Sequence, residues 1–154
     1  MIEKEINIQF KEYLGITSLE EDDRLLILEA RKAIEGSYSP YSKFKVGSAI
    51  RIETGEIILG ANQENIAYPS GLCAERVVLF YAGTKTDNVE SIAIACQNEK
   101  GEWVESYPCG ACLQVMLETE KRANKKLRII VQISSEHFNI FEGVNSLLPF
   151  GFSF

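Results

Sequence analysis

Two apolar, β-branched runs constrain the fold of this chain more than any other feature. They are SIAIACQ at residues 91–97 and LRIIVQI at residues 127–133, and a stretch of helical character from Cys109 to about Asn124 separates them. Strands joined through a helix usually pair in parallel, because antiparallel neighbours need only a short turn. The sequence therefore predicts an α/β protein with parallel pairing in the second half of its sheet.

The first half of the chain adds two helices and a hairpin. Apolar residues at helical spacing predict a helix over residues 19–35, and the pattern Ser18-Leu-Glu-Glu21 favours a capping box at its start. A hairpin over residues 46–60, turning at Glu53-Thr54-Gly55, precedes a buried helix over residues 73–82. The predicted order is helix, hairpin, helix, strand, helix, strand.

Nothing in the sequence divides the chain into two large units. Its 154 residues suit one domain, and 45% hydrophobic with 25% charged residues is ordinary globular composition. We expect residues 18–154 to form that domain. Residues 1–17 form an N-terminal extension, in which apolar residues at even positions favour an extended arm or an edge strand.

The charge balance excludes some classes of partner. Sixteen basic and 22 acidic residues give a formal charge of −6, which would repel the phosphate backbone of a nucleic acid. The N-terminus lacks the pattern of a secretory signal, and no apolar run has the length of a membrane helix. We therefore expect a cytoplasmic protein without a nucleic-acid or membrane partner.

The sharpest chemical signal is the sequence Pro108-Cys109-Gly110-Ala111-Cys112. At a helix start, the two thiols lie one turn apart and face the same point. Unpaired backbone N–H groups and the positive end of the helix dipole stabilise thiolates there. Taken alone, this motif is only moderately specific, and a structural zinc site and a redox pair both stay open.

A third cysteine and a glutamate favour catalysis over these two alternatives. Cys73 also lies at a predicted helix start, and three protein ligands with an open fourth position are the pattern of catalytic zinc. Glu75 could reach a water at that open position. A structural site would need a fourth ligand, but Cys96 lies in an apolar strand and His137, the single histidine, lies beyond the motifs.

The spacing of these residues matches the signature of zinc deaminases, which is Cys-x-Glu followed after about 30 residues by Pro-Cys-x-x-Cys. Four stretches carry a closer resemblance: YSPYSKFKVGSAI (38–50), GANQENIAYPSGLCAER (60–76), PCGACLQV (108–115) and LLPFGF (147–152). In this order they resemble the cytidine deaminases of the short, three-cysteine type. The resemblance covers roughly residues 24–152.

This resemblance implies a fold and an activity for the domain at residues 18–154. The fold would be a three-layer α/β/α sandwich around a mixed five-stranded sheet. The activity would be zinc-dependent hydrolytic deamination of cytidine and 2′-deoxycytidine to uridine and 2′-deoxyuridine, with release of ammonia. It further implies one Zn²⁺ per chain, free nucleosides of pyrimidine salvage as substrates, and a homotetramer whose subunits share their sites.

The resemblance also assigns roles at the metal. Zinc would be held by Cys73, Cys109 and Cys112, and Glu75 would act as general acid and base on water and pyrimidine. Arg76 would hydrogen-bond the ligand thiolates and withdraw part of their charge.

Five further residues would bind the nucleoside. Asn62 and Glu64 would bind the ribose 3′-hydroxyl, Phe44 would pack on the base, and the backbone at Ala74 would bind its amide edge. Phe152 would close the site of a neighbouring subunit.

Two positions depart from the family pattern, and three alternatives stay open. Leu113 and Val77 stand where the family commonly has arginine and threonine, which puts nearby contacts in doubt rather than the reaction. The alternatives are a deaminase of antibiotics or modified nucleosides, a polynucleotide-editing deaminase, and a zinc-binding domain without catalysis. The arginine after Cys-Ala-Glu argues against the antibiotic or modified-nucleoside deaminase. The negative net charge argues against the polynucleotide-editing deaminase, and the intact Glu75 argues against a domain without catalysis.

Overall fold

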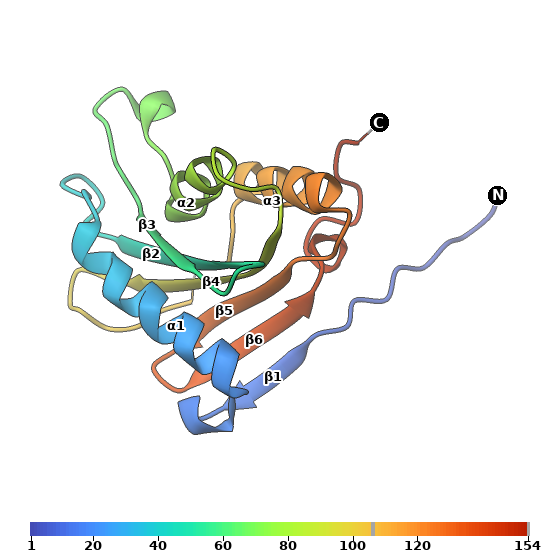
Figure 1. Cartoon of the computed structure of the whole chain (residues 1–154), viewed down its shortest axis with the longest axis horizontal. Helices are drawn as coiled ribbons and strands as arrows, with labels where there is room; N and C mark the ends of the chain where they lie inside the picture. The colour runs from blue at the N-terminus through green and yellow to red at the C-terminus, as the bar shows by residue number, and fades with distance from the viewer. Residues whose placement is uncertain (106, 154) are drawn as a thin grey trace.

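The computed structural model describes residues 1–105 and 107–153, and its centre is one mixed β-sheet with helices on both faces (Figure 1). Helix α1 covers one face, and α2 and α3 cover the other. The helices are α1 (Glu21–Ala33), α2 (Ala74–Ala82) and α3 (Gly110–Ala123), and the strands are β1 (Lys11–Leu14), β2 (Lys45–Ile52), β3 (Ile57–Ala61), β4 (Val89–Gln97), β5 (Arg128–Ser134) and β6 (His137–Glu142). The predicted three-layer α/β/α architecture is confirmed.

The six strands of the sheet lie in the order β1-β6-β5-β4-β2-β3. Strands β4 and β5 pair in parallel, with α3 between them in the chain, and the predicted hairpin forms between β2 and β3. Every other pairing in this sheet is antiparallel. The parallel pair and the hairpin are therefore both confirmed.

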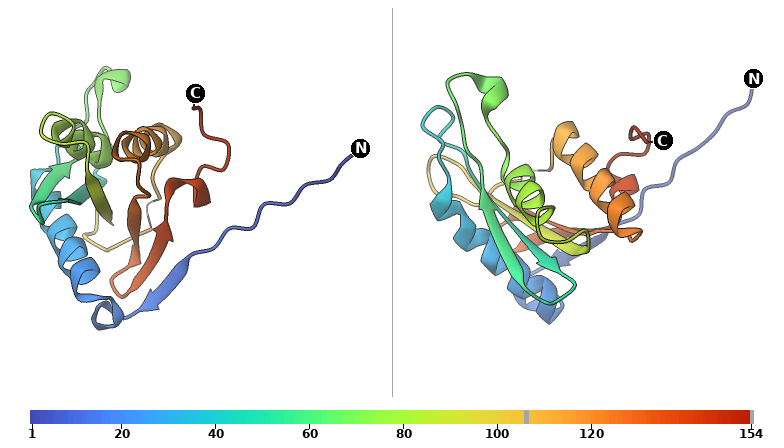
Figure 2. Two further views of the ribbon diagram at one scale, coloured as in Figure 1. Left: turned by 45° about the vertical axis from the view of Figure 1, so that its right-hand side comes forward. Right: turned by 45° about the horizontal axis from the view of Figure 1, so that its top comes forward.

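The strand count differs from the expected five. The sixth strand is β1, which pairs antiparallel with β6 at the edge of the sheet. Residues 1–10 contain no helix or strand and lead away from the sheet edge as an extended arm, which both views of Figure 2 show. The structure thus places the extended arm before a short edge strand.

The start of α1 corrects the predicted capping box. The residue before the helix is Glu20, and no side chain caps its first turn; Ser18 instead donates a hydrogen bond of 2.6 Å to the carbonyl oxygen of Gly15. Ser18 lies in a separate 3₁₀ turn over Ile16–Ser18, so its hydroxyl serves that turn. The first turn of α1 carries three acidic residues, whose charge complements the helix dipole.

Two apolar clusters join the layers. Between α1 and the sheet, Leu26, Ile27 and Ala30 pack with side chains of β2, β4, β5 and β6. The cluster on the opposite face joins α2 and α3 to the sheet. Gly47 allows the close contact of α1, because a Cβ atom there would lie 2.2 Å from the carbonyl oxygen of Ala30. None of the helices formed by residues 1–105 and 107–153 has the length and apolar composition to cross a membrane.

An ion pair between α1 and β5 gives the first prediction. Asp23 is buried, and Arg128 binds its two carboxylate oxygens at 2.9 and 2.7 Å. Arg128→Ala would leave a buried carboxylate without a counter-charge, so we expect the free energy of unfolding to fall by about 3 kcal/mol. Urea denaturation measures it. Lys125→Ala, which removes the exposed ion pair with Glu90, is the control and should change the free energy of unfolding by less than about 1 kcal/mol. Equal losses of unfolding free energy in the two variants would contradict the prediction.

Candidate metal centre and substrate pocket

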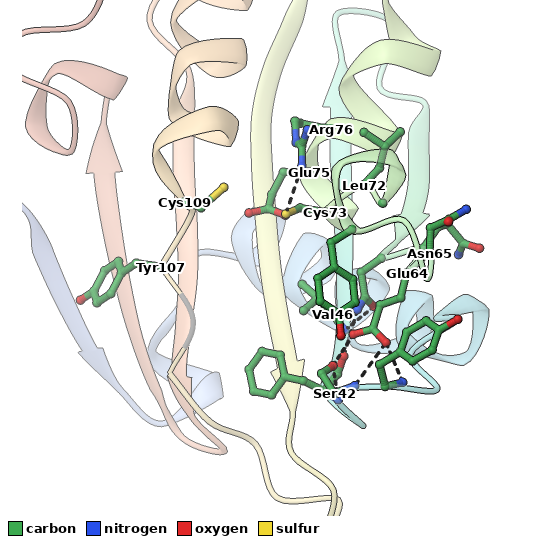
Figure 3. A pocket seen from close by; sticks show the side chains of 16 residues that line it. Ser42, Val46, Glu64, Asn65, Leu72, Cys73, Glu75, Arg76, Tyr107 and Cys109 are labelled. Carbon is green, nitrogen blue, oxygen red and sulfur yellow. Dashed lines mark hydrogen bonds between the residues drawn. The ribbon is translucent and has the colours of Figure 1, made fainter.

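A pocket of about 740 Å³ opens where the starts of α2 and α3 face the loop that follows β3 (Figure 3). Its lining comes from five parts of the chain: the segment before β2, the start of β2, the loop between β3 and α2, the start of α2, and the entry to α3. Seven of the predicted site residues line it: Phe44, Asn62, Glu64, Cys73, Glu75, Arg76 and Cys109.

The three predicted ligand cysteines form one cluster. Cys73 and Cys109 each occupy the position just before a helix, α2 and α3 respectively, and Cys112 lies in the first turn of α3. Their sulfur atoms all lie within 4.8 Å of one another, and those of Cys109 and Cys112 are 3.5 Å apart. Zinc–sulfur bonds of about 2.3 Å in a tetrahedron require sulfur atoms roughly 3.8 Å apart. The donor set therefore fits Zn²⁺, with its fourth position left for water or substrate.

The surroundings of the cluster favour thiolate at Cys73. Hydrogen bonds from the Cys112 thiol and from Arg76, together with the charge of Arg76, lower the pKa of Cys73 to about 5. Hydrogen bonding to Cys73 and burial raise the pKa of Cys112. Nη2 of Arg76 lies 3.6 Å from the Cys73 sulfur. Arg76 is thus placed to neutralise part of the charge that three thiolates would bring to a metal.

Glu75 is a buried carboxyl group beside this cluster. Its residue is 4% exposed, and its carboxyl group lies close to the Cys73 sulfur (Figure 3). Burial raises the pKa of Glu75, and the negative charge of Cys73 acts in the same direction. A carboxyl group whose pKa is raised toward neutrality can both accept and donate a proton during a reaction.

Comparisons with known proteins agree with this arrangement. The family profile described as "Cytidine and deoxycytidylate deaminase zinc-binding region" matches residues 20–126, more than half of the chain. The chain belongs to the cytidine and deoxycytidylate deaminase family. The resemblance stated from the motifs is confirmed.

Individual relatives are similar over more than half of the chain. A cytidine deaminase of Halalkalibacterium halodurans is 44% identical over 98 residues, which is 63% of this chain and 71% of that protein. The crystal structure of a cytidine deaminase from Burkholderia pseudomallei superposes with a TM-score of 0.72 at 33% identity and covers 83% of this chain and 97% of that one. A cytidine deaminase structure from Mycobacterium tuberculosis gives a TM-score of 0.64 at 29% identity, covering 88% and 100%.

In this member of the deaminase family, most hydrogen-bonding positions of the Asn62 side-chain amide are used by contacts within the chain. Its Oδ1 accepts hydrogen bonds from the Ser37 hydroxyl and, at 2.9 Å, from the Val46 backbone N–H. Its Nδ2 donates to the carbonyl oxygen of Phe44 at 2.9 Å. One N–H of the amide is left, so Asn62 can donate to a sugar hydroxyl and has little capacity to accept from it.

Glu64 complements this donor as an acceptor. Its Oε2 accepts from the backbone N–H groups of Tyr41 and Ser42, at 2.9 and 3.3 Å, and its Oε1 accepts from the Ser42 hydroxyl. The hydrogen bond from the Ser42 hydroxyl is the main cause that lowers the pKa of Glu64. Glu64 therefore stays ionised and accepts hydrogen bonds. Ser42 was not predicted as a site residue, although it lies in a serine-rich loop and within the matched stretch at residues 38–50.

Three predicted residues lie outside the lining of this pocket. Cys112 is fully buried in the first turn of α3, where its sulfur atom belongs to the cysteine cluster. Ala74 is fully buried as the first residue of α2, between Cys73 and Glu75. Phe152 is 70% exposed, and its backbone is held on α3 by two hydrogen bonds with the Gln114 side chain, of 2.8 and 3.1 Å. The fold does not bring Phe152 into the pocket of its own chain, and its assignment to a neighbouring subunit stays a prediction.

The two departures from the family pattern occupy different surroundings. Leu113 is buried in the cluster between α3 and the sheet, where an arginine would place a charge among apolar side chains. Val77 is half-buried on α2 and does not line the pocket. The pocket is therefore built without either side chain.

Proposed function

We propose that this protein catalyses the zinc-dependent hydrolytic deamination of cytidine and 2′-deoxycytidine to uridine and 2′-deoxyuridine, with release of ammonia. One observation carries the proposal: a buried carboxyl group, Glu75, lines a pocket beside a cluster of three cysteines that fits zinc, in a chain whose relatives are cytidine deaminases. Cys73, Cys109 and Cys112 would hold the metal.

The chemistry divides between the metal and Glu75. Bound zinc supplies Lewis-acid activation of water, which makes a nucleophile available near neutral pH. Glu75 accepts the proton of the attacking water and delivers it to N3 of the pyrimidine, while oxygen adds to C4. Glu75 then carries a second proton to the amino group at C4, so that ammonia leaves and the carbonyl group of the uracil ring forms. Its burial keeps competing water away from these transfers.

The pocket also supplies the features expected for a free nucleoside. Phe44 offers an aromatic surface for the base, and the backbone at Ala74, beside Glu75, would bind the amide edge of the pyrimidine. The remaining N–H of Asn62 and the Glu64 carboxylate would bind the 3′-hydroxyl as a donor and an acceptor. The negative Glu64 would repel a phosphate near the sugar, which favours nucleosides over nucleotides.

A deamination assay tests the proposal directly. Zinc-loaded protein is incubated with cytidine, 2′-deoxycytidine, CMP, cytosine and single-stranded DNA, and ultraviolet absorbance and ammonia release are followed. We expect turnover of the two nucleosides and no comparable turnover of the other three. Turnover of DNA alone would support the polynucleotide alternative, and absence of turnover in zinc-loaded protein would reject the proposed substrates.

The sugar contact gives the second prediction. Glu64→Gln keeps the shape of the side chain but removes its charge, and we expect kcat/KM for cytidine to fall about 10- to 100-fold, mainly through KM. With 3′-deoxycytidine the wild type already lacks the contact, so the variant should lose little more. Steady-state kinetics on both substrates measures this. An equal loss on the two substrates would show that Glu64 acts on the loop at Tyr41 and Ser42 instead of on the 3′-hydroxyl.

We further propose a cytoplasmic homotetramer in pyrimidine salvage, with Phe152 contributed to the site of a neighbour. The exposure of Phe152 and its attachment to α3 support this assignment. The third prediction follows. Phe152→Ala and Glu75→Gln proteins should each be less active alone, and hybrids formed by refolding them together should recover activity, because some sites combine an intact Glu75 with a neighbour's intact Phe152. Steady-state rates of the mixture measure the recovery, with separately refolded variants as the control. A mixture no more active than its components would contradict shared sites.

A further inference from the structure

Tyr107 lines the pocket and lies on the far side of Cys109 from Cys73 (Figure 3). It lies two residues before Cys109, in a stretch without helix or strand, and its side chain points away from the cysteine cluster (Figure 3). Its hydroxyl oxygen accepts a hydrogen bond of 2.7 Å from Nδ2 of Asn139. Its ring meets the ring of Phe141 edge-on, with centroids 6.1 Å apart.

Both partners of Tyr107 belong to strand β6 and face the layer that contains α3. Asn139 and Phe141 are two residues apart, so their side chains leave the same face of the sheet. Phe141 is part of the apolar cluster between the sheet and α3, and Phe10 from the N-terminal arm stacks on it at a centroid distance of 5.3 Å. Tyr107 therefore contacts β6 through both its hydroxyl group and its ring, although the residue is 40% exposed.

Asn139 is an unfavourable residue for its position if only stability is considered. It is 5% exposed, and its Oδ1 has no hydrogen-bond partner within the described part of the chain. A buried amide with part of its hydrogen bonds unmade costs free energy that an apolar side chain would not cost. An apolar residue at this position could not donate the hydrogen bond that Asn139 gives to the Tyr107 hydroxyl.

Cys109 is the ligand that depends most on such support. Arg76 contacts Cys73, and Cys112 is buried within the first turn of α3. Cys109 is exposed, precedes the helix, and makes no capping hydrogen bond with its side chain. Its position therefore depends on the direction in which residues 107 and 108 enter the helix.

We propose that Tyr107 is a positioning residue for the zinc ligand Cys109, fixed by the hydrogen bond from Asn139 and by the ring of Phe141. By holding the entry to α3, it keeps the Cys109 sulfur where the other two sulfur atoms can share one metal ion. The inference rests on zinc being the metal of the proposed function and requires no particular substrate.

The test measures metal release from the zinc-loaded full chain into an excess of a chromogenic chelator. We expect Tyr107→Ser to release zinc about 10-fold faster than the wild type, as is typical when a group that orients a metal ligand is lost. Tyr107→Phe keeps the ring and should restore much of the slow release. Asn139→Leu removes the donor of the same hydrogen bond, so it should resemble Tyr107→Phe, with release faster than in the wild type but slower than in Tyr107→Ser. The visible spectrum of cobalt-substituted protein, which reports ligand geometry, should change in Tyr107→Ser.

Tyr81→Ser is the matched control, because Tyr81 is an exposed tyrosine on α2 that does not line the pocket. Urea denaturation of all four variants separates positioning from general loosening. Faster release without a matching loss of unfolding free energy supports the proposal. Release at the wild-type rate with an unchanged cobalt spectrum overturns it, and so does release that follows unfolding free energy in all four variants. Because no substrate enters the assay, its result is independent of whether cytidine is deaminated.

Discussion

Glu75→Gln is expected to lower kcat for cytidine about 10²- to 10⁴-fold while leaving zinc bound. Glutamine has nearly the same volume and can stay in the buried position, but it cannot accept a proton from water or pass one to N3. The measurement combines steady-state kinetics with metal analysis of the same sample. The cysteines are unchanged in this variant, so its zinc content should match that of the wild type.

Two further measurements make this result specific to proton transfer. Glu64→Gln applies the same chemical change in the same pocket and should act mainly on KM, so it controls for the loss of a carboxylate in general. Binding of uridine to Glu75→Gln should persist, because the sugar contacts do not involve Glu75. A variant that keeps wild-type kcat would exclude Glu75 as the general acid and base.

Cys112→Ala is expected to abolish both zinc retention and turnover. The substitution removes one of three sulfur donors from a fully buried position, and two thiolates cannot hold the ion in the geometry that leaves one position open. Metal analysis after dialysis against a chelator measures the loss, and added zinc should not restore the wild-type rate.

Cys96→Ala is the matched control for this variant. Cys96 is equally buried but lies in β4, outside the cluster of sulfur atoms. We expect it to keep its zinc and its turnover, with only a modest loss of stability. Zinc retained by Cys112→Ala at the wild-type level would exclude Cys112 as a ligand.

The fold was predictable where the hydrophobic pattern was long and regular. The parallel strands β4 and β5 and the hairpin of β2 and β3 follow from continuous apolar runs and from a turn at Glu53-Thr54-Gly55. Strand β1 has four residues, and β6 mixes polar with aromatic residues, so neither gives a clear period of its own. Both form because they pair with neighbours that only the folded sheet provides.

The reacting and metal-binding residues of the site were predictable from their spacing, whereas two residues that support the site through hydrogen bonds were not. Fixed spacings at helix starts predicted the roles of Cys73, Glu75 and the Cys109–Cys112 pair. The structure brings the three sulfur atoms together beside the pocket that Glu75 lines. Ser42 donates a hydrogen bond to Glu64, which is 22 positions away in the chain. Asn139 donates one to Tyr107, which is 32 positions away. No local pattern records such contacts, because they depend on which loops the sheet brings side by side.

The edge strand β1 has a consequence for how this protein behaves at high concentration. It covers the backbone edge of β6, whose residues 138–141 read Phe-Asn-Ile-Phe, and its own outer edge is short and carries the exposed Lys11 and Glu12. A long apolar strand with a free edge is a template for pairing between molecules, whereas a short charged one is not. The few residues before α1 therefore protect the sheet against aggregation, a role that motif comparison with shorter relatives would miss.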